Sequence, residues 1–213
     1  MKDHIALRRG PIEWLSIELR QLIMSAITDV QSLKSAALSC PSLYYAFSNA
    51  ETIITTHVLF NQVGCDVPLE AVAALESSRL RPPTKQGIQD FVAKYLRQRC
   101  PLPRSWTLRD ALPVGKLHLS LRDFATKFAN ACLTKEPLRS ATLTTPTPGE
   151  RDRINRALYR FEIFCNLFRK PDVVNFEDQR NLFFSNFSPW ENEQLACIHD
   201  FLVRQISPGK KCK

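Results

Sequence analysis

Apolar residues recur at helical spacing near the start of the chain. Ser16 is an expected N-cap, and Glu18 is an acidic residue that favours the positive end of a helix. Four apolar residues of the stretch that follows would lie on one helical face: Leu19, Leu22, Ile23 and Ile27. The pattern therefore predicts an amphipathic helix, which ends in a turn at Thr28-Asp29.

Two more short helices are expected before residue 50. Leu33 to Leu38 carries apolar residues at helical spacing. Cys40-Pro41 then breaks the chain, because proline disfavours helix in the residue before it. A third helix restarts through Leu43 and Phe47. A fourth is expected over 51–63, although its run of β-branched residues weakens the helical preference.

The middle of the chain alternates helical stretches with proline-rich breaks. Helices are expected from Pro68, from Gly87 to Arg99 and from Ser120 to Leu133. Between the last two, the prolines predict an irregular stretch, and these are Pro101, Pro103 and Pro113.

The last third opens with a clear helix start. Thr147 and Glu150 have the spacing of a capping box. The residues that follow at helical spacing predict an apolar stripe: Ile154, Leu158, Phe161, Cys165 and Phe168. The opposite, polar face is expected to carry Arg153, Arg156, Arg160 and Glu162.

An aromatic block follows in the last fifty residues, and it precedes a last helix that is expected to end near Gln205. Its members are Phe183, Phe184, Phe187 and Trp190. We expect this Phe-rich block, whose residues recur at helical spacing, to form part of the hydrophobic core. The alternative is that the Trp190-Glu191 stretch lines a pocket for a segment of a partner protein.

These elements predict an all-α protein. We expect a three-helix N-terminal module over 11–63, packed on a larger, irregular helical body over 64–213, with a Thr/Pro-rich linker near 140–149. The chain has 6 glycines and 14 prolines. This balance favours helices joined by stiff loops over a sheet with tight turns.

The N-terminal module resembles an F-box. The resemblance is carried by three stretches and Phe47, and the stretches are Leu15-Ser-Ile-Glu-Leu-Arg-Gln-Leu-Ile, Asp29-Val-Gln-Ser-Leu and Leu38-Ser-Cys-Pro-Ser-Leu. The blocks that begin at Arg153 and at Phe187 also resemble F-box-like proteins of filamentous fungi. The resemblance of the N-terminal module to an F-box covers about a quarter of the chain.

The resemblance implies a non-enzymatic adaptor, the substrate-receptor subunit of a Skp–cullin–F-box ubiquitin ligase. The module would bind a Skp-type adaptor protein, and the body would recruit an unknown client protein. The residues implied in adaptor binding are Leu15, Ser16, Leu19, Ile23, Leu33, Leu38, Leu43 and Phe47.

A second interpretation is a helical interaction module that has lost adaptor binding. Ser16 stands where the F-box pattern usually has proline, and Pro41 follows Cys40 where a basic residue is common. The apolar residues of the module would then simply pack against the rest of this chain.

The positive charge suggests a third interpretation. The net charge is +8, and residues 79–139 alone contribute 13 basic against 4 acidic residues, which is +9. Weak binding of nucleic acid would use the arginines near one tryptophan: Arg97, Arg99, Arg104, Arg109 and Trp106. No helix-turn-helix, zinc-finger or RNA-binding motif accompanies them. A solvated basic face, or a client surface for an acidic partner, is therefore the preferred interpretation.

Catalytic and metal-binding motifs are absent from the sequence. The seven cysteines form no C-x-x-C pair, and the four histidines lie far apart. His199-Asp200 is expected to be an ordinary surface pair, because adjacent helical residues point about 100° apart. No apolar run approaches the roughly 20 residues that span a bilayer. We therefore expect no enzyme activity, cofactor or membrane span, and a cytoplasmic or nuclear location.

Overall fold

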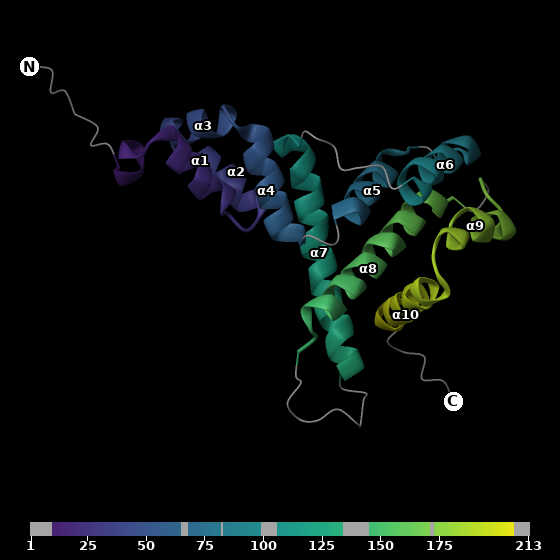
Figure 1. Ribbon diagram of the computed structural model, residues 1–213. Helices are drawn as coiled ribbons and strands as arrows, with labels where there is room; N and C mark the ends of the chain where they lie inside the picture. Colours follow the sequence, from purple (N-terminus) through teal and green to yellow (C-terminus); the bar gives the residue numbers. More distant parts are fainter. Residues whose placement is uncertain are drawn as a thin grey trace, which may run out of the picture. The chain divides into compact units, whose positions relative to one another are not determined.

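The computed structural model describes residues 10–64, 68–81, 83–98, 106–133, 145–170 and 173–206. Within these ranges every regular element is helical, which confirms the all-α prediction (Figure 1). The chain forms two compact units. Unit 1 contains Met1–Gly64 and Pro103–Gly115, and unit 2 contains Cys65–Leu102 and Lys116–Lys213.

Unit 1 is built from short helices. They are the 3-10 turn η1 (Pro11–Trp14), α1 (Ile17–Ser25), α2 (Val30–Ala37), α3 (Pro41–Ser48), α4 (Glu51–Val63) and the first part of α7 (Leu108–Leu133). Ser16 caps α1 and Asp29 caps α2, and Pro41 is the first residue of α3. These starts agree with the sequence pattern. Ser and Asp are favoured caps, and the first helical position accommodates proline.

The core of unit 1 lies where α3 and α4 meet α1 and α2. Both of the first two helices pack against both of the next two. The side chains that fill this core are almost fully buried: Met24, Val30, Leu33, Leu43, Phe47, Ile54 and Val58. The sequence pattern singles out Leu33, Leu43 and Phe47 among these residues, whereas Met24 and Val30 lie on no predicted apolar face.

Gln62 links three segments of unit 1 through its side-chain amide. Its Oε1 accepts a hydrogen bond from the Val30 backbone N–H at 3.0 Å, and its Nε2 donates to the Gly115 carbonyl at 3.0 Å. A Cβ atom added at Gly115 would lie 2.7 Å from Gln62 Oε1. A larger residue at position 115 would therefore have to displace the amide end of the Gln62 side chain.

Helix α7 corrects one prediction. It begins at Leu108 and runs through Pro113, where an irregular stretch was expected before a helix at Ser120. The start of α7 is anchored from outside, because the Leu108 backbone N–H donates to the Glu51 carboxylate at 2.9 Å. This long-range contact stabilises the first turn, and Pro113, the sixth residue of α7, lacks the N–H that would bond to the Arg109 carbonyl.

Unit 2 contains the rest of α7 and the remaining helices. They are α5 (Pro68–Arg79), α6 (Lys85–Phe91), the π-helical turn η2 (Val92–Arg97), α8 (Pro148–Phe168), α9 (Phe176–Leu182), the 3-10 turn η3 (Phe184–Asn186) and α10 (Pro189–Ile206). Helix α8 packs against both α5 and α10 (Figure 1). The predicted capping box is confirmed at its start, where the Thr147 and Glu150 side chains each bind the other residue's backbone N–H.

The central place of α8 corrects the prediction for Arg160. This residue was expected on a polar outer face, but it is 5% exposed. Its guanidinium contacts Glu70 Oε1 at 3.2 Å and Glu191 Oε1 at 2.8 Å, and it lies 4.8 Å from the centre of the Phe187 ring. Burial alone would raise the pKa of Glu191, but hydrogen bonds from Ser188 and the charge of Arg160 lower it. Because α8 packs against both α5 and α10, it has no solvent-exposed polar face at Arg160.

Aromatic side chains fill the space at the C-terminal end of α8. Phe164 lies 5.0 to 5.4 Å, centre to centre, from Phe168, Phe183 and Phe184. Phe183 is fully buried, so the expected role of this block as core is correct for that part. Trp190 differs, because its side chain is 80% exposed.

A buried polar pair joins α7 to α8 within unit 2. The Nδ1 atom of His118 lies 3.1 Å from the Tyr159 hydroxyl, and both side chains are buried. Burial, with a smaller contribution from the nearby charge of Arg122, lowers the pKa of His118 from 6.5 to about 4. Burial also raises the pKa of Tyr159. The imidazole is therefore neutral at physiological pH.

Replacing Arg160 with methionine is expected to lower the free energy of unfolding by about 3 kcal/mol, because two acidic groups lose their shared counter-charge. Lysine at this position should recover only part of the loss, since one ammonium group does not span both carboxylates as a guanidinium does. Urea unfolding measures both effects. Arg156→Met on the same helix is the control and should change stability by less than about 0.5 kcal/mol. Equal midpoints for the two methionine variants would contradict this account.

Stability is also expected to depend on the protonation of His118. The unfolded histidine titrates near 6.5 and the folded one near 4, so the unfolded chain binds more protons between these values. The free energy of unfolding should therefore fall by about 3 kcal/mol as the pH drops from 7 to below 4. His118→Gln, compared with wild type in urea titrations at several pH values, should lose this component. His57→Gln, at an exposed position, should keep it.

Candidate protein-interaction surface

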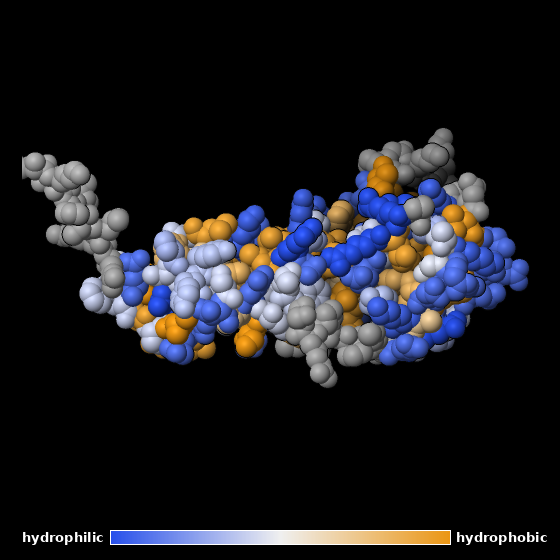
Figure 2. Space-filling view, turned by 90° about the horizontal axis from the view of Figure 1, so that it is seen from above, coloured by the Kyte–Doolittle hydropathy of each residue, from blue (hydrophilic) through white to orange (hydrophobic). Residues whose placement is uncertain are grey.

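The apolar stripe of α1 faces solvent. Leu19, Leu22 and Ile23 have exposed fractions of 48%, 67% and 47%. We call these three residues the α1 apolar face. The space-filling view shows apolar side chains at the surface of unit 1, on the left (Figure 2). Exposed aliphatic residues on one side of a short helix are typical of a protein-binding surface.

The other side of α1 explains this orientation. Arg20 Nη1 donates to the Ser42 carbonyl at 2.9 Å, and Gln21 Nε2 donates to the Ala46 carbonyl at 3.0 Å. Both acceptors belong to α3. Met24, one turn further on, is 1% exposed. The helix thus turns Arg20, Gln21 and Met24 towards the unit interior, and the three residues of the α1 apolar face remain outside.

Further apolar side chains are exposed in the same unit. Trp14 of η1 is 74% exposed, and Leu38 at the end of α2 is 65% exposed. Tyr44 and Tyr45 on α3 are more than half exposed. Tyrosine and tryptophan combine a large apolar area with a polar group, and they are enriched where proteins bind one another.

The predicted adaptor-binding residues divide into two groups. Leu19, Ile23 and Leu38 are exposed, Ser16 is exposed as the α1 cap, and Leu15 is half-buried. The other three are core residues of unit 1: Leu33, Leu43 and Phe47. They support the surface from below and offer little area to a partner. Leu22 and Tyr45 were absent from the predicted set, although the same helical spacing places Leu22 on the α1 apolar face.

The predicted basic surface is not assembled around its tryptophan. Trp106 is 3% exposed and belongs to a core, so it offers no face on which a nucleic-acid base could stack. Arg97 and Arg109 are exposed, and Arg97 Nε donates to Asn186 Oδ1 at 3.0 Å. Arg99 and Arg104 lie outside the described residues.

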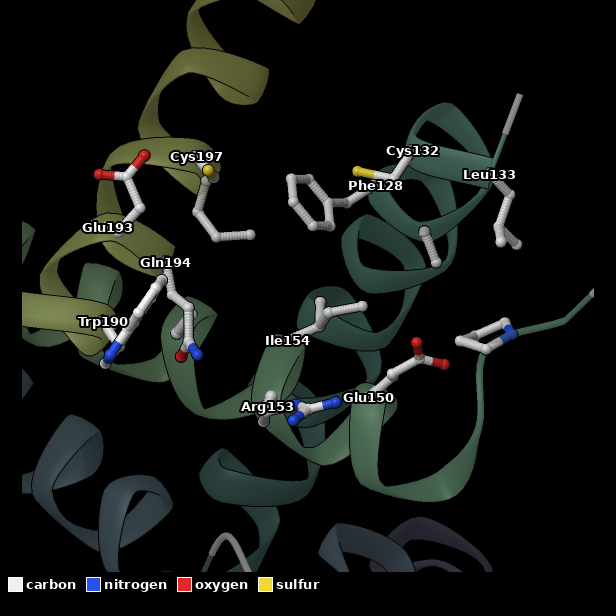
Figure 3. Close-up of a pocket in the computed structure, with 14 residues that line it drawn as sticks. Phe128, Cys132, Leu133, Glu150, Arg153, Ile154, Trp190, Glu193, Gln194 and Cys197 are labelled. Atoms are coloured by element: carbon white, nitrogen blue, oxygen red, sulfur yellow. The ribbon is translucent and has the colours of Figure 1, made fainter. Parts of the chain in front are cut away.

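Unit 2 carries an apolar groove of about 330 Å³ between α8, α10 and the last turns of α7. In Figure 3, Phe128, Cys132 and Leu133 face Trp190, Glu193, Gln194 and Cys197 across the groove, and Glu150, Arg153 and Ile154 come from α8. Trp190 thus lines a groove, as the alternative interpretation of its stretch proposed. Carboxylates and a guanidinium stand beside the apolar walls, so the groove suits an amphipathic segment better than a purely apolar one.

Groups with catalytic or metal-binding chemistry are scattered. Within the described ranges, no three His, Cys, Asp or Glu side chains come together in a way that could hold a metal ion. His199 Nδ1 lies 3.2 Å from Asp200 Oδ1, and both side chains are exposed, as expected for a surface pair. Burial and neighbouring acidic groups raise the pKa of Cys165 and of Cys197, which makes both thiols poor nucleophiles at neutral pH.

Comparisons with known proteins give no match to a family model, to a curated protein or to a solved structure. In the part of the chain that the structure describes, no single helix is long and apolar enough to cross a bilayer. Helices α4 and α5 together have a sufficient length and apolar composition, but they form two separate helices.

The division between core and surface predicts contrasting effects of leucine substitution in unit 1. Leu33→Ala should lower the free energy of unfolding by about 2–5 kcal/mol, because it empties part of a closed core. Leu22→Ala, on the α1 apolar face, should change it by about 0.5 kcal/mol or less. Denaturant unfolding of both variants measures the difference. Similar losses would show that the α1 apolar face is covered.

Proposed function

We propose that unit 1 is a protein-binding module of the F-box type, and that it binds a Skp-type adaptor through the α1 apolar face. The protein would then be the non-enzymatic substrate receptor of a cullin–RING ubiquitin ligase, with unit 2 recruiting a client protein. The observation that carries this proposal is the solvent-facing stripe of Leu19, Leu22 and Ile23, which lies inside the segment that resembles an F-box.

Burial energetics support the proposal. Three aliphatic side chains that are about half exposed leave apolar area to be removed from water, and each would contribute about 1 kcal/mol on being covered. The exposed tyrosines of α3 and Trp14 add aromatic area in the same unit. The hydrogen bonds of Arg20 and Gln21 to α3 hold α1 in place. Binding of the adaptor would therefore require little loss of conformational entropy in α1.

The loss of adaptor binding remains the competing proposal. Ser16, which replaces the usual proline of the pattern, has a local role of its own, because its hydroxyl accepts from the Leu19 backbone N–H at 3.4 Å. A module that lost its adaptor would keep this cap and the helical trio. The two proposals therefore differ in the affinity for the adaptor and not in the fold.

The test is co-purification of the full chain with a fungal Skp-type adaptor, followed by a titration with purified components. The wild-type protein should form a complex at micromolar concentration. Leu19→Asp combined with Ile23→Asp should weaken it at least tenfold, which corresponds to about 1.4 kcal/mol, because two charges would be buried in the interface.

The matched control is Ile206→Asp, which places a charge at an 81% exposed apolar position of unit 2. It should bind the adaptor as wild type does. Folded wild-type protein that forms no complex would refute the ligase proposal and favour the module without adaptor binding. Salt-sensitive binding of duplex or single strands, tested in parallel at two salt concentrations, would instead favour the nucleic-acid interpretation.

A further inference from the structure

We draw no further inference here: the strongest candidate, the apolar groove between α8, α10 and the last turns of α7 in unit 2, is bordered by Leu133 and Pro146 on either side of a segment that lies outside the described residues, and nothing in the structure shows what covers it.

Discussion

The surface of unit 1 depends on how α1 is rotated about its own axis. Two hydrogen bonds, from Arg20 and Gln21 to carbonyl groups of α3, fix that rotation. Each satisfies a side-chain donor near the unit interior, where an unpaired one would be costly. The helix could otherwise bury its aliphatic stripe against α3 and α4. Because it does not, the α1 apolar face is available, and the adaptor-binding proposal follows from this rotation more than from the sequence resemblance alone.

Local signals in the sequence predicted the starts of helices well. Ser16, Thr147 and Pro41 stand at the expected positions, because capping and the proline preference act over a few residues. The amphipathic period also identified the stripe on α1. It could not tell whether that stripe faces the interior or solvent, because the answer lies in contacts to α3 more than twenty residues away. The candidate site was therefore predicted only in part, with core residues and surface residues mixed.

Two predictions failed where polar contacts decide the structure. Arg160 belongs to the core of unit 2 because Glu70 and Glu191 reach it from two other helices, and Glu70 is 90 residues away along the chain. Helix α7 begins at Leu108 because Thr107 caps it, its Oγ1 accepting from the Asp110 backbone N–H at 3.3 Å, and because Glu51 also binds the first turn. In both cases a polar partner distant in sequence contributes to the result.

The raised pKa values of Cys165 and Cys197 have a consequence for how the protein withstands oxidants. Both side chains reach solvent, yet burial of part of each thiol and the acidic groups beside them keep the sulfur protonated at neutral pH. The thiolate is the form that attacks disulfides and peroxides. Peroxides and disulfides in the surroundings would therefore oxidise either thiol slowly, which delays cross-linking of one chain to the next.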